Sequence, residues 1–263
     1  MGGTKTFELL TDDLDAPAAG AWNMALDHAL LESVQSNPRA VLRLYRWQPA
    51  CLSFGRNQPA RGYYDAAAAR AAGIDIVRRP TGGMAVLHDC ELTYAVVAPA
   101  HLLGGPRESY RTINAALVAG LQTLGVPAAM AGQDKRGAFG ATHPCFAEPA
   151  AGEVVANGRK LVGSAQRYEK RTLLQHGSIL IDGSQDVVAH IANVPFDLAG
   201  RATTISELLG SAPPIGALAA AIATGFAKVT GHEVVPADLR EKEAKRASEL
   251  EALYGSDEWT WRR

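Results

Sequence analysis

Cys145 and Lys160 are the two residues of this chain whose types and spacing point most directly to chemistry. Cys145 lies in a His-Pro-Cys-Phe segment, and Lys160 follows fifteen positions later in the segment 158–166 (GRKLVGSAQ). A thiolate is a strong nucleophile, and a nearby ammonium group lowers the pKa of a thiol. The Asn-Gly pair at 157–158 is typical of a hairpin turn that would fold the lysine segment back toward a common cleft. If the two side chains meet there, they form an activated nucleophile.

Each of these residues also has a structural interpretation. A single loop cysteine is often an idle thiol, and a lysine between apolar strand neighbours is often a solubility feature of a sheet edge. The other two cysteines differ in setting: Cys51 lies in an apolar strand and is expected in the core, whereas Cys90 follows His88 and Asp89 and is a rival nucleophile for the same cleft.

A second candidate site is the segment 78–89 (RRPTGGMAVLHD), between two expected strands. Paired glycines let a ligand approach the backbone closely, and exposed N–H groups can receive an anion or a carbonyl oxygen. Arg78 and Arg79 would add a charged clamp, and His88 would add a hydrogen bond. The alternative is a plain turn with surface arginines, because Gly-Gly loops are common.

Polar residues also interrupt two strand-like segments at and after Lys160. On a regular strand Lys160, Val162 and Ser164 would share one face. Gly163 would let a ligand lie against the backbone beside them. His176 adds a polar point to an apolar run, where a histidine is more often a satisfied core residue than a catalyst.

The bulk composition indicates an ordinary globular protein. The 263 residues are 47% hydrophobic and 20% charged, with a formal net charge of −1, which gives no electrostatic reason to expect a nucleic-acid partner. Three scattered cysteines exclude a disulfide framework or a zinc site, and no metal is expected. The absence of a secretory or membrane-spanning segment favours a cytoplasmic location.

Periodicity and turn residues predict one α/β (α+β) domain with a central mixed sheet flanked by helices. Helices are expected at 21–35 (capped from within 12–15), 64–72, 109–124, 203–209, 215–229 and 236–253. Strands are expected at 40–47, 51–54, 74–77, 92–98, on both sides of 157–158, and at 172–181. The segment 131–151 is expected to be a long surface loop that carries Cys145.

Three motifs in this order resemble the biotin/lipoate protein ligase superfamily: the segments 78–89, 158–166 and 174–180 (LQHGSIL). The resemblance extends from about residue 20 to residue 260. It implies a single catalytic domain over 1–263, with its core at about 20–255 and without a complete accessory C-terminal domain. Met84 departs from the family pattern, which commonly has a glycine or a polar residue there.

Within the superfamily, the position of Cys145 ahead of the lysine motif looks like the Gram-positive-type, cysteine-dependent octanoyltransferase. The resemblance implies that Cys145 is the nucleophile and that Lys160 lowers its pKa and could later act as a base. Backbone N–H groups near Cys145 or at Gly163 and Ser164 would stabilise the oxyanion. The residues expected to bind the acyl group or the donor's arm are Arg79, Thr81, Gly82, Gly83, His88, Gly163, Ser164, Ala165 and His176.

The implied reaction moves an octanoyl group from acyl carrier protein, through a cysteine thioester, to a lysine of a lipoyl domain such as the glycine-cleavage H protein or an E2 subunit. No cofactor is expected beyond the phosphopantetheine arm that the donor carries. Three alternatives remain open: an ATP- and magnesium-dependent lipoate ligase, an amidotransferase between lipoyl domains, and a non-enzymatic module that binds such partners. An acidic partner could meet Arg56, Arg61, Arg136 or Arg167.

Overall fold

The computed structural model describes residues 6–11, 14–132, 146, 151–195 and 200–263. Its larger sheet has the strand order β11-β1-β2-β6-β10-β9-β8-β7. The strands β11, β1 and β2 run parallel, and the remaining neighbours are antiparallel, which confirms the predicted mixed sheet. The eight strands are β1 (Thr6–Leu10), β2 (Ala40–Tyr45), β6 (Glu91–Pro99), β7 (Ala128–Met130), β8 (Val154–Ala156), β9 (Arg159–Glu169), β10 (Thr172–Leu180) and β11 (Glu233–Pro236).

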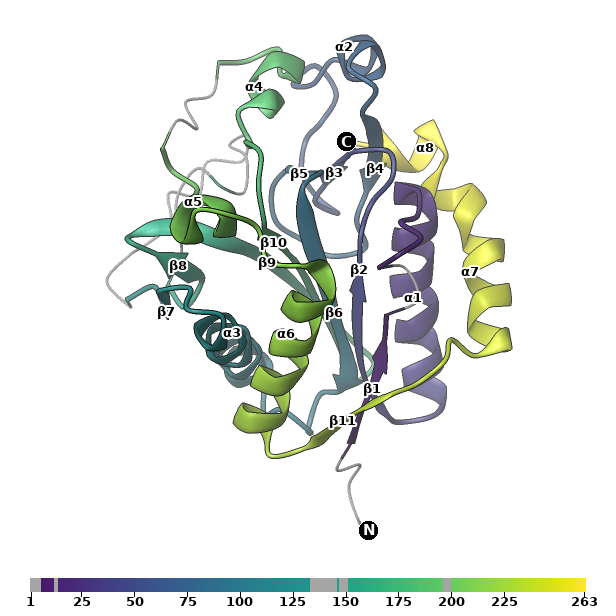
Figure 1. Cartoon of the computed structure of the whole chain (residues 1–263). Coiled ribbons are helices and arrows are strands. Elements are labelled where there is room, and N and C mark those ends of the chain that lie inside the picture. Colours follow the sequence, from purple (N-terminus) through teal and green to yellow (C-terminus); the bar gives the residue numbers. More distant parts are fainter. Residues whose placement is uncertain (1–5, 12–13, 133–145, 147–150, 196–199) are drawn as a thin grey trace.

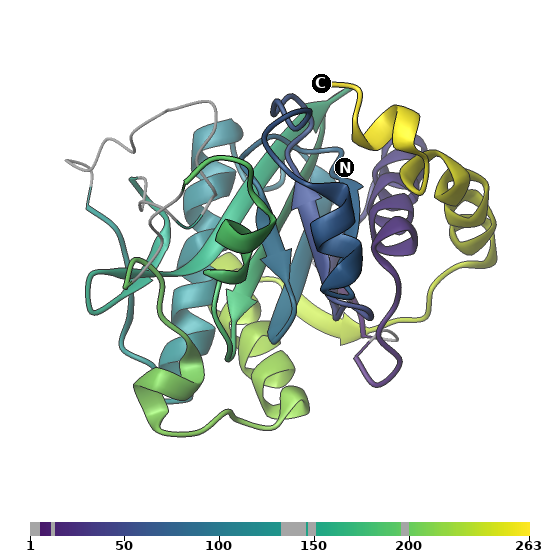
Figure 2. The same ribbon diagram turned by 90° about the horizontal axis from the view of Figure 1, so that it is seen from above.

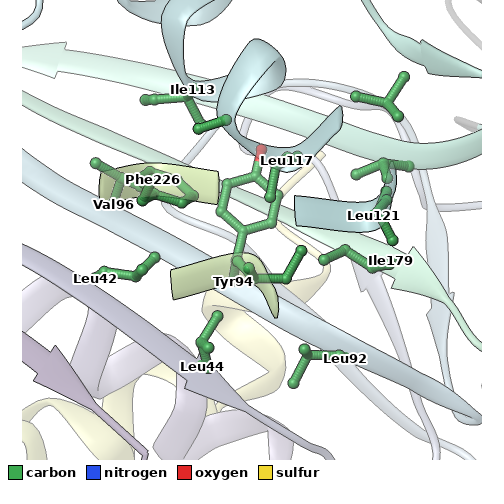
Figure 3. Close-up of a cluster of buried hydrophobic side chains, with 14 of the residues drawn as sticks. Leu42, Leu44, Leu92, Tyr94, Val96, Ile113, Leu117, Leu121, Ile179 and Phe226 are labelled. Atoms are coloured by element: carbon green, nitrogen blue, oxygen red, sulfur yellow. The ribbon is translucent and has the colours of Figure 1, made fainter. Parts of the chain in front are cut away.

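Helices cover both faces of this sheet (Figure 1, Figure 2). The helices α3 (Pro106–Thr123) and α6 (Ile215–Thr230) pack on one face, and α1 (Gly20–Ser36) and α7 (Glu241–Tyr254) pack on the other. Figure 3 shows the first of these cores, where Leu117 of α3 and Phe226 of α6 lie close to Tyr94 of β6. Because both faces are covered, the central strands are buried along almost their whole length.

A smaller sheet with the order β4-β3-β5 carries the glycine-containing segment. It consists of β3 (Cys51–Phe54), β4 (Asp75–Arg78) and β5 (Val86–His88), so residues 79–85 form the connection between its two outer strands. The short helices α2 (Ala66–Ala71) and α4 (Val187–Ile191) pack against this sheet. The remaining short helices are α5 (Ile205–Leu209) and α8 (Asp257–Thr260).

One predicted helix cap and one predicted helix start are wrong. Helix α1 begins after Ala19, whose side chain makes no cap hydrogen bond, so Asp15 does not cap it; residues 12 and 13 lie outside the described residues. The predicted helix at 236–253 begins only at Glu241, because Pro236 still belongs to β11 and pairs with Leu9. None of the described helices is both long and apolar enough to cross a bilayer.

The predicted surface loop at 131–151 lies mostly outside the described residues, and Cys145 is among those left out. Phe146 is described, and its side chain is 1% exposed. It packs with Val86 and Leu180 in a small apolar cluster. For Phe146 the expectation of a surface position is wrong, because its side chain is buried against β5 and β10.

Candidate active site

A narrow cleft lies where the two sheets meet helix α1. Its mixture of apolar walls with a few polar groups is typical of a small-molecule site. The apolar side chains that line it are Met24, Tyr45, Trp47, Val86 and Ala165. The polar ones are Arg79, His88, Thr93, Ser164, His176 and Ser178.

Most of the predicted binding residues come together at this cleft. Thr81 lies directly behind the lining, with its Oγ1 2.6 Å from Nε2 of His176. Gly82 and Gly83 lie in the same loop and not in the lining, and Arg79 donates a hydrogen bond to the Gly82 carbonyl oxygen at 3.0 Å. The six predicted residues that line the cleft are Arg79, His88, Gly163, Ser164, Ala165 and His176.

Arg78 and Arg79 do not form the clamp that the sequence predicts. As neighbours at the end of a strand their side chains diverge. Arg79 turns to the cleft and donates hydrogen bonds to Ser53 Oγ at 2.7 Å and to the Met84 carbonyl oxygen at 2.8 Å. Arg78 is fully buried and donates instead to main-chain oxygens, including that of Thr260 at 2.8 Å. Only Arg79 therefore remains a candidate for contact with a ligand.

A chain of buried hydrogen bonds ties the glycine loop to helix α1. The Thr81 hydroxyl meets Nε2 of His176, and Nδ1 of His176 lies 2.8 Å from Oδ2 of Asp27. Arg43 donates to Asp27 Oδ1 at 2.9 Å. Burial alone would raise the pKa of Asp27, but the His176 hydrogen bond and the Arg43 charge hold this pKa below its ordinary value. Burial lowers the pKa of His176, which favours the neutral ring.

A second chain of hydrogen bonds fixes the aromatic wall. His88 stacks on Trp47 with ring centroids 4.0 Å apart. Its Nε2 lies 2.7 Å from Ser53 Oγ, and its Nδ1 lies 3.1 Å from Glu91 Oε1. Thr93 links Trp47 to Glu91, because its hydroxyl accepts a hydrogen bond from Trp47 Nε1 and donates one to Glu91. The His88 ring is therefore held by both nitrogens and one face, as expected of a rigid cleft wall.

A register shift between β8 and β9 orients Lys160. The turn that joins these strands is the predicted one, with positive φ at both Asn157 (50°) and Gly158 (78°). Val154 pairs with Val162 but Val155 pairs with Lys160, which leaves Leu161 as an extra residue. Because neighbours on β8 point to opposite sides, their partners Lys160 and Val162 do so as well. The prediction that these two residues share one face is wrong.

Lys160 is 1% exposed and is paired on both sides, with Val155 of β8 and with Ala202, so it is not a solubility feature of a sheet edge. Its Nζ lies 2.8 Å from Oε1 of Glu153 and 5.3 Å from the centre of the Phe146 ring. Phe146 in turn contacts Val86, which lines the cleft. The lysine thus lies behind one wall of the cleft, next to the residue that follows Cys145 in the chain.

The two described cysteines lie away from the cleft lining. Cys51 is fully buried, as predicted, and burial raises the pKa of its thiol. Cys90 is exposed and borders a different recess, with Gly183 and Ser184. Partial burial and the carboxylates of Asp89 and Asp182 raise the pKa of Cys90, which disfavours its thiolate. The expectation that Cys90 lines the same cleft is wrong.

Several buried polar residues of the site were missed from the sequence. Arg43 carried a readable signal, because it is the single charge within an otherwise apolar strand. Asp27 was harder to single out, because α1 also contains His28 and Glu32. Glu153 gave no such signal, since its role depends on the shifted pairing that follows it. The other residues of the site that were not predicted, polar and apolar, are Met24, Tyr45, Trp47, Ser53, Val86, Glu91, Thr93, Gly177 and Ser178.

Comparison with known proteins identifies the class to which this fold and cleft belong. Residues 19–227 match the lipoyl protein ligase A/B catalytic domain, and the chain belongs to this family. Among solved structures, a lipoate-protein ligase A bound with ATP superposes with a TM-score of 0.81 at 25% identity, over 99% of each chain. A bipartite lipoate protein ligase from Thermoplasma acidophilum superposes with a TM-score of 0.78 at 25% identity, over 99% of this chain and 96% of that one.

Sequence relatives narrow the class. The octanoyltransferase LipM of Kyrpidia tusciae is 38% identical over 93% of this chain and 96% of its own length. The octanoyltransferase LipM of Symbiobacterium thermophilum is 38% identical over 93% of this chain and 95% of its own length. That of Moorella thermoacetica is 36% identical over 98% of this chain and 99% of its own length. The protein is accordingly an acyltransferase of the group to which these octanoyltransferases belong.

Proposed function

We propose that the protein transfers an octanoyl group from acyl carrier protein to Cys145, and from there to a lysine of a lipoyl domain. The observation that carries this proposal is the position of the Lys160 ammonium group, 5.3 Å from the ring of Phe146 and behind the wall of an apolar cleft. Phe146 is joined to Cys145 by one peptide bond, and Cys145 itself lies outside the described residues.

In the first step the Cys145 thiolate attacks the carbonyl carbon of the octanoyl thioester. The tetrahedral intermediate collapses, the new cysteine thioester forms, and the carrier's thiolate leaves and takes up a proton. The positive charge of Lys160 favours the attacking thiolate. Gly163 and Ser164 support an oxyanion site. Along β9, alternate main-chain N–H groups point away from β10, and at these two residues β8 no longer pairs with β9 on that other side. An N–H group there is available to bind the oxyanion.

In the second step the neutral amine of the acceptor lysine attacks the cysteine thioester. An amide forms, the Cys145 thiolate is regenerated, and the amine nitrogen loses a proton. The Lys160 Nζ and Glu153 Oε1 atoms lie 2.8 Å apart, so these two groups would accept the proton together, as a coupled pair. The proposal includes no metal and no cofactor besides the phosphopantetheine arm of the donor.

The test is intact-protein mass spectrometry after the protein is mixed with octanoyl-acyl carrier protein in the absence of ATP. We expect a mass gain of one octanoyl group, labile to hydroxylamine, in the wild type and in the Cys90→Ala control. We expect no gain in Cys145→Ala, and a slower gain in Lys160→Met. Labelling of a lipoyl domain only from octanoate, ATP and magnesium, with no enzyme adduct, would establish the ligase alternative instead.

The choice of acyl donor distinguishes the proposed function from the amidotransferase alternative. An octanoylated lipoyl domain offered as the donor, with a second lipoyl domain as acceptor, would reveal an amidotransferase. We expect octanoyl-acyl carrier protein to acylate Cys145 much faster than an octanoylated lipoyl domain does, because a thioester is more reactive than an amide. The reverse order would overturn the proposed donor.

A further inference from the structure

Arginine side chains without acidic partners line a recess outside the cleft. This recess is formed by Arg56, Asn57, Arg262 and Arg263. Elsewhere in the described residues, arginines do form ion pairs with carboxylate side chains, among them Arg39, Arg43, Arg159, Arg167, Arg240 and Arg246. The recess therefore concentrates positive charge that no described carboxylate side chain neutralises.

The arrangement of this recess is fixed by several contacts. The guanidinium of Arg262 stacks on Trp259 at 3.8 Å and donates to the main-chain oxygen of Arg56 at 2.5 Å. The main-chain N–H groups of Ala60 and Arg61 donate to the main-chain oxygen of Arg263 at 2.9 and 3.0 Å. The segment after β3 and the last residues of the chain thus form one rigid rim.

The electrostatics of the recess favour an anion. Burial and the neighbouring charges of Arg56 and Arg263 lower the pKa of Arg262. Beneath it, fully buried Arg78 has a guanidinium nitrogen, Nη2, that finds no hydrogen-bond acceptor among the described residues. Burial, followed by the charges of Arg262, Arg79 and Arg263, lowers the pKa of Arg78 to about 10. A bound anion would relieve this mutual repulsion.

The recess adjoins the cleft through the glycine loop. The main-chain N–H of Arg56 donates to the Thr81 carbonyl oxygen at 2.7 Å. The hydroxyl of the same threonine lies 2.6 Å from His176, which lines the cleft. An extended molecule that reaches into the cleft past this loop would place its outer part beside the arginines.

We propose that this recess binds the phosphodiester group of the donor's phosphopantetheine arm, an inference that rests on the proposed acyl-carrier donor. The arm presents its thioester at one end and its only charge, the phosphodiester, near the other. Guanidinium groups match phosphate oxygens in charge and in paired hydrogen-bond geometry. The recess would hold the root of the arm while the acyl chain occupies the cleft.

The test compares the wild type with the double variant Arg56→Gln/Arg263→Gln. The hydrogen bonds that Arg56 and Arg263 make within the described residues come from their main chains, so the substitutions remove charge and keep these bonds. The control is Arg111→Gln, an exposed arginine of α3 on the opposite face of the sheet. The measured quantity is the second-order rate constant of octanoyl adduct formation on Cys145, with three donors: octanoyl-acyl carrier protein, octanoyl-phosphopantetheine and octanoyl-pantetheine.

We expect the double variant to lose about tenfold or more per arginine with both phosphate-containing donors, and less than about twofold with octanoyl-pantetheine. The control should lose nothing with any donor. Equal losses with all three donors, or none, would overturn the proposal. A loss confined to the intact carrier protein would also overturn it, because the recess would then bind acidic side chains of that protein and not the phosphate of the arm. Absence of any adduct on the wild type would instead refute the proposed function.

Discussion

The ammonium nitrogen of Lys160 lies 2.8 Å from the carboxylate oxygen Oε1 of Glu153, and both side chains are buried. Glu153 immediately precedes β8, and Lys160 lies near the start of β9, so the hairpin at Asn157 and Gly158 brings the two together. A buried ammonium group needs a counter-charge, because its desolvation would otherwise be costly. The pair therefore allows a charged lysine to stay at the rear wall of an apolar cleft.

Breaking this ion pair should destabilise the protein. Glu153→Gln and Lys160→Met should each lower the free energy of unfolding by about 3 kcal/mol, because each leaves a buried charge without its partner. The double variant should lose clearly less than the sum, with a coupling energy above about 1 kcal/mol. Urea denaturation of the four proteins measures this cycle.

The neighbouring exposed pair serves as the control. Arg159 and Glu207 are 2.6 Å apart, with side chains 32% and 49% exposed, and their coupling should stay below about 1 kcal/mol. Equal coupling energies in the two cycles would contradict the view that burial sets the strength of the Lys160 pair.

Phe146 should couple packing to acylation. Phe146→Ala removes the ring that contacts Val86, Leu180 and the Lys160 ammonium, with an expected stability loss of about 3 kcal/mol. Acylation of Cys145, followed by mass spectrometry under conditions where the variant remains folded, should slow markedly. Phe146→Leu keeps most of the apolar contact and should retain most of the rate. Equal rates in the two variants would show that anchoring at Phe146 does not position the thiol.

Met24 should limit acyl-chain length. Its side chain is fully buried in α1 and lines the apolar part of the cleft. Each buried CH₂ contributes about 0.8 kcal/mol, so room for two more carbons is worth up to about fifteenfold in selectivity. Met24→Ala should therefore raise the rate for decanoyl relative to octanoyl donors in competition assays. Leu31→Ala, an equally buried change on α1 outside the cleft lining, should leave the ratio unchanged.

His176 should make the protein less stable in mild acid. Burial lowers the pKa of His176 from its ordinary value of 6.5, so below that pH the unfolded chain binds more protons than the folded one. The stabilising contribution is complete above pH 6.5 and is lost as the pH falls toward the folded-state pKa. Urea denaturation between pH 7.5 and 5.5 should show this decline.

Two variants locate the source of that decline. His176→Gln should flatten the pH dependence, whereas replacement of the exposed His190 of α4 by glutamine should leave it as in the wild type. A decline that persists unchanged in His176→Gln would exclude this histidine as its origin.

Local patterns were enough to predict the main helices and strands. The apolar spacing of 21–35 and the Asn-Gly turn at 157–158 act through near neighbours, and both were confirmed. Strands β1 and β11 were missed because they are short and pair only with each other and with β2, through contacts distant in sequence. No pattern within either segment reveals such a pairing.

The cleft was predicted in part, for the same physical reason. The glycine loop and His176 stand out as polar or conformationally special residues within apolar segments, and they do converge. The orientation of Lys160 could not be predicted, because it depends on an extra residue, Leu161, that only the pairing with β8 defines. Cys145 lies outside the described residues, so its place at the cleft remains a prediction.

The pairing of β11 with β1 determines when the cleft can fold during synthesis on the ribosome. Strand β1 lies between β2 and β11, and helix α7 covers α1. Elements from the start of the chain therefore pack against elements from its last thirty or so residues. Trp259 also donates a hydrogen bond to the main chain of Arg78, just before the glycine loop. Contacts this distant in sequence form late. A nascent chain would therefore gain a finished cleft only after nearly all of it had been synthesised.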